Sequence, residues 1–336
     1  MVPTSSALKM RALVAHGPGS IATLKIEKVD RPVVGKDGVL VRVHASSVNP
    51  VDLYTLTPVA HLQRSLKPAV MGTDISGTVE TVGAAVTRFK AGDEVFGGAR
   101  GAFAEFAGAR DRNLAHKPAG VSFENAGTLA VAGCTALQAV RDHGRVSAGQ
   151  RVLINGASGG VGTFLVQIAK AFGAEVTAVC SARNVELARS LGADRIVDYS
   201  QADFTDGGER YDVMLDVAGN RSWSDCMRIL ERGAICVAVG AAGLQHGKGG
   251  TWRALGHLLG VRVASMRSGV RATVFIARLN SNDLTVLGNL VESGRVAPVI
   301  DRRYDLSQAA DAMAYLNEGH SRGKIAIEIG ASRPGS

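Results

Sequence analysis

The alternation of apolar and polar positions changes its character once along the chain, near Ser122. Before this point, short strand-length runs are separated by Gly, Pro and Asp. Runs of this kind, punctuated by turn residues, predict a small and mostly antiparallel β domain. The predicted strands cover residues 11–15, 38–46, 74–82 and 93–97.

After Ser122 a helical pattern over residues 123–142 leads into repeated strand–helix units. Continuous apolar strands that alternate with amphipathic helices predict a parallel sheet covered by helices on both faces. The strands are expected at 151–155, 175–180, 195–198, 212–216 and 234–240, and the helices at 160–172, 184–191 and 222–231. Two more helices, 283–293 and 307–318, and a short strand, 324–329, complete the pattern.

A glycine-rich turn, Gly156 to Gly162, follows the first strand of this series and opens a helix. Glycines at such a junction permit a tight turn, admit a pyrophosphate close to the backbone, and allow the helix to pack on the strand. The amides and dipole at the helix start favour an anion. The turn therefore predicts a bound dinucleotide, although a glycine turn without a ligand would look the same. The expected contacts are Ala157, Ser158, Gly159, Gly160, Val161 and Gly162.

The end of the second strand of the series, after Cys180, distinguishes the two nicotinamide dinucleotides. An NAD site usually carries an acidic residue there for the ribose hydroxyls, and this chain carries none. Ser181 and Asn184 can donate hydrogen bonds, and Arg183 adds a charge that suits a 2′-phosphate. NADPH is the predicted cofactor. Tyr199 could flank the adenosine phosphate, or be an ordinary half-buried tyrosine.

The composition agrees with a globular protein that binds a small anion. The net charge is +8, but no run of Lys and Arg stands out, so we expect no nucleic-acid partner. None of the four cysteines forms a CxxC pair, which predicts buried thiols in a reducing cytoplasm. The amino-terminal segment has no apolar core typical of a signal peptide, and no apolar stretch is long enough for a membrane span.

Several motifs together carry a family resemblance over most of the chain. Besides the glycine turn and the helix that follows it, they are residues 47–54 (SVNPVDLY), 72–77 (GTDISG), 90–97 (KAGDEVFG), 191–199 (LGADRIVDY) and the pair Gly323-Lys324. This set resembles the zinc-independent quinone oxidoreductases of the medium-chain dehydrogenase/reductase superfamily. The resemblance implies a Rossmann domain, residues 123–266, inserted in a GroES-like β-rich domain made of residues 1–122 and 267–336. It also implies bound NADPH and a homodimer.

Two residues indicate chemistry without a metal. The resemblance places Asn49 where zinc-dependent relatives carry a catalytic Cys, and Thr73 where they carry a His. No cysteine precedes Cys134, and the histidines are dispersed, so we expect no zinc site. Without a Lewis acid, the alkoxide of a simple alcohol is poorly stabilised. A quinone or another α,β-unsaturated carbonyl is an easier hydride acceptor, because the negative charge spreads onto oxygen.

The resemblance also suggests the residues of the site. The candidate catalytic residues are Asn49, Asp52 and Tyr54. Asn49 is expected near the nicotinamide ribose and Tyr54 as a hydrogen-bond or proton donor. For Asp52 the alternative is that it orients the loop by bonding backbone amides. Tyr54 could equally line the pocket. Further cofactor contacts implied by the resemblance are Thr135, Val217, Ala218, Gly240 and Lys324, and the last could equally be a strand-edge lysine.

Two alternatives remain open from the sequence. One is an enoyl-thioester reductase, which needs a basic groove for its carrier; Arg253, Arg262, Arg267 and Arg271 could supply charge. The other is an NADPH-binding protein with no enzymatic activity. We favour the reductase of quinones or enones, since nothing in the sequence disables hydride transfer.

Overall fold

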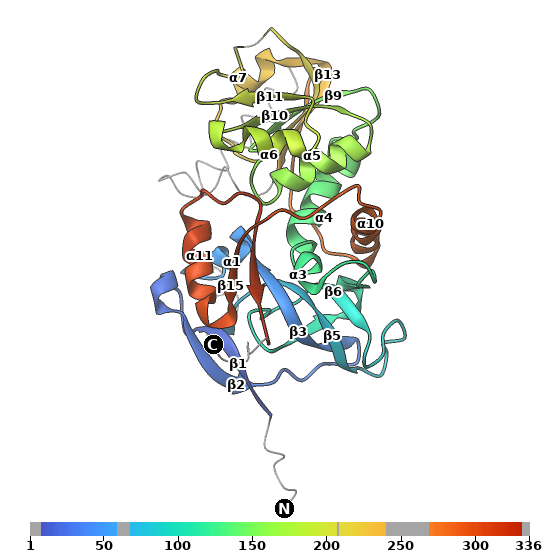
Figure 1. Cartoon of the computed structure of the whole chain (residues 1–336), viewed down its shortest axis with the longest axis vertical. Coiled ribbons are helices and arrows are strands. Elements are labelled where there is room, and N and C mark those ends of the chain that lie inside the picture. Colours follow the sequence, from blue (N-terminus) through green and yellow to red (C-terminus); the bar gives the residue numbers. More distant parts are fainter. Residues whose placement is uncertain (1–7, 59–67, 207, 240–268, 331–336) are drawn as a thin grey trace, which may run out of the picture. The chain divides into compact units, whose positions relative to one another are not determined.

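The computed structural model describes residues 8–58, 68–206, 208–239 and 269–330 (Figure 1). Contacts divide the chain into two compact units. Unit 1 comprises Met1–Ala132, Leu279–Glu292 and Ile300–Ser336, and unit 2 comprises Gly133–Arg278 and Ser293–Val299. None of the described helices is long and apolar enough to cross a membrane.

Unit 1 is built on β-sheet, and nearly all of its strand pairs are antiparallel, as the sequence predicts. The seven-stranded sheet has the order β15-β16-β3-β5-β6-β8, with β7 paired to β3, and a smaller sheet has the order β2-β1-β4. Only β15 and β16 pair in parallel among these strands. The strands are β1 (Lys9–Ala15), β2 (Lys25–Asp30), β3 (Gly38–Val48), β4 (Ala69–Val70), β5 (Asp74–Val82), β6 (Glu94–Gly98), β7 (Phe106–Arg110), β8 (Leu114–His116), β15 (Ile300–Asp305) and β16 (Lys324–Glu328).

Short helices lie against this sheet: α1 (Pro50–Tyr54), α3 (Phe123–Ala126), α10 (Ser281–Glu292) and α11 (Ala309–Asn317). The core beneath them includes the fully buried side chains of Met71, Ile75 and Phe103. Gly72 must be glycine at this point, since its φ is +95° and a Cβ atom would lie 2.5 Å from the Phe103 ring. The packing of the core thus fixes the turn that leads into β5.

Unit 2 is a parallel six-stranded sheet in the order β11-β10-β9-β12-β13-β14, and Figure 1 shows α5 and α6 on one face of it. This is the strand order of a doubly wound Rossmann fold, which confirms the predicted class. The strands are β9 (Arg151–Asn155), β10 (Glu175–Cys180), β11 (Arg195–Asp198), β12 (Tyr211–Asp216), β13 (Leu230–Val239) and β14 (Arg271–Phe275). The helices are α5 (Gly162–Ala171), α6 (Val185–Ser190) and α7 (Trp223–Arg228), while α4 (Ala130–Gln138) leads in from unit 1.

The helical run expected over residues 123–142 is interrupted in the structure. Residues 127–129 separate α3 from α4, and a π-helical turn, Ala139–His143, follows α4. At the interruption, the Asn125 carbonyl accepts from both the amide and the hydroxyl of Thr128, at 3.1 and 2.7 Å. This local side-chain bond competes with the regular helical pattern.

Candidate functional site

The glycine turn follows β9 and has two kinds of glycine. At Gly162 a Cβ atom would lie 2.1 Å from the carbonyl oxygen of Gly156, so the fold itself requires glycine there. At Gly159 the nearest atom to such a Cβ would be 3.7 Å away, which leaves open space over the turn. Within the described part of the chain, the amides of Gly160 and Val161 have no hydrogen-bond acceptor. Among the described residues, the turn therefore offers two unpaired amides beside an open space, as an anion requires.

The loop after β12 lies against this turn. The Val217 amide donates to the Asn155 carbonyl at 3.0 Å, and the Ala218 amide nitrogen would lie 3.3 Å from a Cβ atom at Gly156. Neighbouring strands β9 and β12 form the point where the strand order reverses, and Rossmann folds bind ligands at the carboxyl ends of such strands. The structure thus places Val217 and Ala218 beside the glycine turn.

Asn155, which sequence reasoning missed, connects the end of β9 to the end of β12 and the loop after it. Its side-chain amide donates to Asp216 Oδ1 and to Asn220 Oδ1, both at 2.9 Å. The bonds hold the ends of β9 and β12 together. The position of Asn155, directly before the first glycine at the end of an apolar strand, was the signal that could have drawn attention to it.

A third group lies at the end of β10. The side-chain amide of Asn184 donates to Ser158 Oγ at 2.9 Å and to Ser181 Oγ at 3.0 Å. These two bonds join the end of β10 to the glycine turn. Asn184 is only 4% exposed, and within the described residues its Oδ1 atom has no hydrogen-bond partner. A buried acceptor without a partner costs free energy. The hydroxyl of a ribose would supply the missing donor, so this part of the site fits a dinucleotide.

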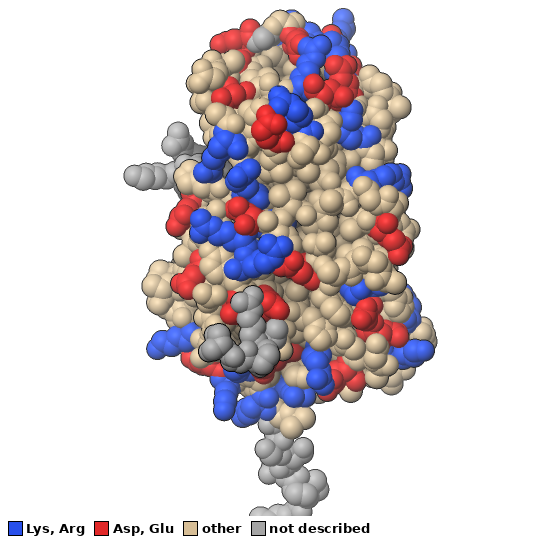
Figure 2. Space-filling view, viewed as in Figure 1, with Lys and Arg blue, Asp and Glu red and all other residues tan. Residues whose placement is uncertain are grey.

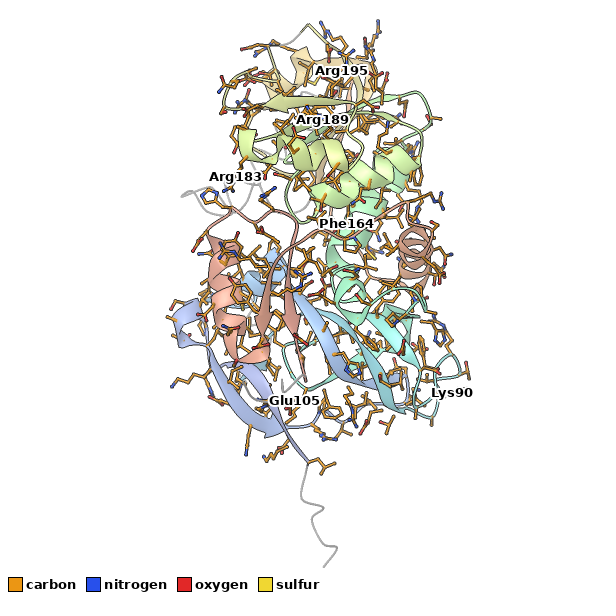
Figure 3. All side chains as sticks on the ribbon, in the orientation of Figure 1. Lys90, Glu105, Phe164, Arg183, Arg189 and Arg195 are labelled. Atoms are coloured by element: carbon orange, nitrogen blue, oxygen red, sulfur yellow. The ribbon has the colours of Figure 1, made fainter. Side chains whose placement is uncertain are left out.

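Arg183 and Tyr199 are exposed near these residues. Arg183 lies at the N-terminal end of α6, with Arg189 further along that helix (Figure 3). The Tyr199 amide donates to the Cys180 carbonyl at 3.0 Å, so the tyrosine stands beside the end of β10. The nearby Asp198 carboxylate already accepts from the amide and hydroxyl of Ser200, at 3.0 and 2.8 Å.

The other predicted cofactor contacts of the Rossmann region have different outcomes. Thr135 is buried on α4. Gly240 lies outside the described residues, and so do Arg253, Arg262 and Arg267. All four cysteines are free and buried, as predicted. Burial raises the pKa of Cys180 to about 11 and that of Cys226 to about 12, so neither is a ready thiolate.

The predicted catalytic residues Asn49 and Asp52 meet in a buried polar cluster of unit 1. The backbone amide of Asn49 donates to Asp52 Oδ2 at 2.7 Å, across the first turn of α1. The Thr73 hydroxyl donates to Asp52 Oδ1 at 2.8 Å. Asp52 therefore orients its loop through a backbone amide, as the sequence suggested.

Burial of Asp52 raises its pKa to about 7. The hydrogen bonds from Thr73 and from the Asn49 amide oppose this rise, as does the charge of Lys324, whereas the negative charge of Asp74 adds to it. At neutral pH the carboxyl is thus close to its midpoint. A buried carboxyl poised in this range can hold or release a proton.

Lys324 and Asp74 form the charged part of the same cluster. Lys324 is 3% exposed and begins β16, which is paired on both sides, so it is not a strand-edge lysine. Its ammonium contacts the Val48 carbonyl at 3.3 Å, the side-chain oxygen of Asn49, and Asp74 Oδ2 at 3.5 Å. These contacts use its three N–H donors. Burial lowers the pKa of Lys324, and the charges of Asp74 and Asp52 oppose that effect.

Sequence reasoning missed Asp74, although its carboxylate is the acceptor that most groups of the cluster share. Its carboxylate accepts from the Ser47 hydroxyl at 2.7 Å, the Asn49 side chain at 2.9 Å and the Val131 amide at 2.9 Å. The motif at residues 72–77 contained it, but no local pattern marked its partners.

Tyr54, at the end of α1, is 49% exposed, and within the described residues its hydroxyl has no hydrogen-bond partner. It is therefore available to a ligand. The described residues contain no group of three or more His, Cys, Asp or Glu that could hold a metal. On the face shown in Figure 2, Lys and Arg side chains are interrupted by Asp and Glu.

Comparisons with known proteins agree with this geometry. Residues 35–119 match the family model described as alcohol dehydrogenase GroES-like domain, and residues 191–327 match the one described as zinc-binding dehydrogenase. The NADPH-dependent alkenal/one oxidoreductase, chloroplastic, of Arabidopsis thaliana is 32% identical over 95% of this chain and 79% of its own length. The 2-methylene-furan-3-one reductase of Solanum lycopersicum is 32% identical over the same shares.

Among solved structures, the quinone oxidoreductase from Coxiella burnetii superposes with a TM-score of 0.84 and 29% identity, covering 96% of this chain and 100% of its own. The family model for the second segment bears a zinc-binding name, yet the resemblance places Asn49 and Thr73 at the positions where zinc-dependent relatives carry the catalytic Cys and His. The chain belongs to the zinc-independent quinone oxidoreductase subfamily of the medium-chain dehydrogenase/reductase superfamily.

Proposed function

We propose that this protein reduces quinones or other α,β-unsaturated carbonyls with NADPH, by hydride transfer and without a metal. Two observations on neighbouring parts of the site carry the proposal: Asn184 Oδ1 is buried without a hydrogen-bond partner among the described residues, and a Cβ atom at Gly159 would meet open space. Both features suit a dinucleotide: the first lacks a donor that a ribose supplies, and the second leaves room for a pyrophosphate.

In this proposal the cofactor supplies the hydride, and unit 2 holds and orients the cofactor. The pyrophosphate lies on the amides of Gly160 and Val161, which have no acceptor among the described residues. Thr135, Val217 and Ala218 line the nicotinamide half, while Ala157 and Ser158 belong to the wall of the glycine turn; a contact from Gly240, outside the described residues, stays a prediction. For Asn49 and Lys324, direct contact with the cofactor stays a prediction, because the bonds within their cluster support a positioning role.

The choice of NADPH over NADH rests on the end of β10. Ser158 and Ser181 each accept from Asn184, so each hydroxyl keeps its own hydrogen for another acceptor. Arg183 adds a cation at an exposed position, as a 2′-phosphate requires. Replacing Arg183 by alanine should raise the Kd of NADPH at least about tenfold and leave that of NADH nearly unchanged. Equal losses for both dinucleotides would contradict the phosphate assignment; Arg189→Ala, near the end of α6, is the matched control.

The substrate class rests on the relatives and on Tyr54. The relatives named above reduce alkenals, a methylene furanone or quinones, all conjugated carbonyls. The free hydroxyl of Tyr54 can donate a hydrogen bond to the carbonyl oxygen that gains charge.

The direct test is NADPH oxidation with 1,4-benzoquinone, phenanthrenequinone and a 2-alkenal, each compared with crotonyl-CoA. Turnover of quinones or alkenals supports the proposal. Preference for crotonyl-CoA would instead indicate an enoyl-thioester reductase. Tight NADPH binding without turnover of any acceptor would refute an enzymatic role in these classes.

We also propose a homodimer in the cytoplasm. Among the described strands, β14 is an edge of the parallel sheet, and it carries Val274 with 48% of its surface exposed; Ile276 just beyond it is 92% exposed. An exposed apolar edge strand favours pairing with another chain. The four free thiols suit a reducing compartment.

A further inference from the structure

Thr73 connects the buried carboxyl of Asp52 to the surface of unit 1. Its hydroxyl lies 2.8 Å from Asp52 Oδ1; Thr73 is partly exposed, whereas Asp52 is fully buried. The turn at Gly72 fixes the backbone just before Thr73, because only glycine fits against Phe103 there. The hydroxyl is thus held between a buried acid and the outside by the fold itself.

Among the described residues, Thr73 is the hydrogen-bond partner of Asp52 that can exchange a proton. The other carboxyl oxygen, Oδ2, accepts from the backbone amide of Asn49 at 2.7 Å, and an amide does not pass on a proton readily. The charged groups that face Asp52 are Asp74 on β5 and Lys324 on β16, and these two are engaged with each other and with Asn49. Burial raises the pKa of Asp52 to about 7, so a substantial fraction carries a proton at neutral pH.

We propose that Thr73 and Asp52 form a proton relay that protonates the oxygen of the enolate left by hydride addition; this inference rests on the proposed function. In the ionised state of Asp52 the Thr73 hydroxyl donates to Oδ1; once Oδ1 is protonated, its O–H donates to Thr73 Oγ1 and the Thr73 hydrogen turns toward the enolate. The Asp52 O–H bond then breaks as its proton passes to Thr73 Oγ1, and the Thr73 O–H bond breaks as its own proton passes to the enolate oxygen. An enol forms, and it becomes the saturated carbonyl compound in water. The Asp52 carboxylate then recovers a proton from solvent through the Thr73 hydroxyl.

The relay matters more for one class of acceptor than for the other. An alkenal enolate is strongly basic, so a positioned acid accelerates its formation. Reduction of a quinone leaves a phenolate, which is much less basic and can take its proton from water after release. The ratio of alkenal turnover to quinone turnover therefore reports on the relay, whereas damage to the fold or to cofactor binding lowers both.

The experiment compares Thr73→Val, Thr73→Ser and the full-length wild type. The control is Thr81→Val, an exposed threonine on the same strand, β5. The kcat values for a 2-alkenal and for 1,4-benzoquinone are measured at saturating NADPH between about pH 5 and about pH 9. NADPH affinity is measured by fluorescence, and folding by thermal unfolding.

We expect Thr73→Val to lower the alkenal kcat about 100-fold and the alkenal-to-quinone ratio at least about tenfold. Thr73→Ser should recover most of the ratio, and Thr81→Val should keep the wild-type ratio. In the wild type, the alkenal kcat should fall as the pH rises through about 7, because only protonated Asp52 can donate. Asp52→Asn should lower the alkenal kcat to that of Thr73→Val, and its remaining alkenal turnover should no longer fall as the pH rises through about 7.

Equal losses on both acceptors in Thr73→Val would overturn the relay and leave Thr73 a structural role. A wild-type ratio in a folded Thr73→Val variant would overturn it as well. If the wild type oxidises NADPH with neither acceptor, the proposed function itself fails, which is distinguishable because no variant is needed to see it.

Discussion

The two glycines of the turn after β9 predict opposite outcomes when each is replaced by alanine. At Gly162, the new Cβ would lie 2.1 Å from the Gly156 oxygen and 2.7 Å from the Ala157 carbonyl carbon. Both are backbone atoms, so the turn itself must move. Overpacking of this kind costs about 3 kcal/mol, and the helix preference of alanine returns about 1 kcal/mol. Gly162→Ala should therefore lose about 2 kcal/mol of stability.

At Gly159 the nearest atom would be 3.7 Å from the new Cβ, an ordinary contact. Stability should change by less than about 0.5 kcal/mol. The added methyl group, however, fills the space that a pyrophosphate would approach, so NADPH affinity should fall about 10- to 100-fold, or about 1.4 to 2.8 kcal/mol. Gly162 is therefore required by the fold, whereas Gly159 is required by the ligand.

The assay is thermal unfolding of both variants without and with NADPH, together with a fluorescence titration of NADPH. Gly159→Ala should unfold at the wild-type temperature without NADPH and show a reduced shift with it. Gly162→Ala should unfold at a lower temperature, by about 2 to 4 °C per kcal/mol. A folded Gly159→Ala protein that binds NADPH as tightly as the wild type would refute the reasoning. So would a wild-type unfolding temperature for Gly162→Ala.

Three further predictions follow from the buried cluster and from the sheet edge. The pKa of Asp52 is about 7 in the folded protein, and its ordinary value is 3.8. Between these two pH values the folded state holds a proton on Asp52 that the unfolded state has lost. The free energy of unfolding should therefore fall by about 4 kcal/mol as the pH rises through that window. Asp52→Asn should remove this contribution in urea unfolding at about pH 4 and about pH 8, and an identical pH dependence in both proteins would contradict it. Lys324→Met should cost about 3 to 5 kcal/mol because it leaves Asp74 without its cation, and Lys324→Met with Asp74→Asn should cost less than the sum of the single changes; additive losses would contradict the pairing. Val274→Lys with Ile276→Lys should give monomers in light scattering, and a monomeric wild type would refute the proposed dimer.

Strands β9 to β13 of unit 2 were the most predictable part of the fold, whereas β14 in the same sheet was not predicted. Strands β10 and β11 begin and end at the residues that the sequence indicated. Each is an apolar run bounded by polar residues and glycine, so its local pattern suffices to define it. Strand β15, with the sequence IDRRYD, was missed because its charged residues lie on an edge strand and give no apolar signal.

The candidate site also has a part that the sequence predicts and a part that it does not. The glycine turn and the end of β10 are local motifs, and the sequence was enough to name Ser158, Ser181 and Asn184. It was not enough to show that one asparagine joins the two serines. The partners of Asp74 are 250 positions away at Lys324 and 57 away at Val131, and no periodicity connects positions so distant.

The buried cluster shows how unit 1 can do without a metal at the two positions where zinc-dependent relatives carry Cys and His. The side chain of Asn49 is fully hydrogen-bonded within the cluster: its amide nitrogen donates to Asp74, and its amide oxygen accepts from Lys324. The buried ammonium of Lys324 therefore already supplies positive charge at this place. A zinc ion at this place would face that ammonium at close range, which is unfavourable. Tyr54 is 49% exposed and its hydroxyl has no hydrogen-bond partner among the described residues, whereas the Thr73 hydroxyl donates to Asp52 and becomes a donor toward the outside only when Asp52 is protonated. Hydroxyl donors stabilise a charge that is already dispersed over a conjugated carbonyl far better than a localised alkoxide, and this limits the chemistry of unit 1 to acceptors of that kind.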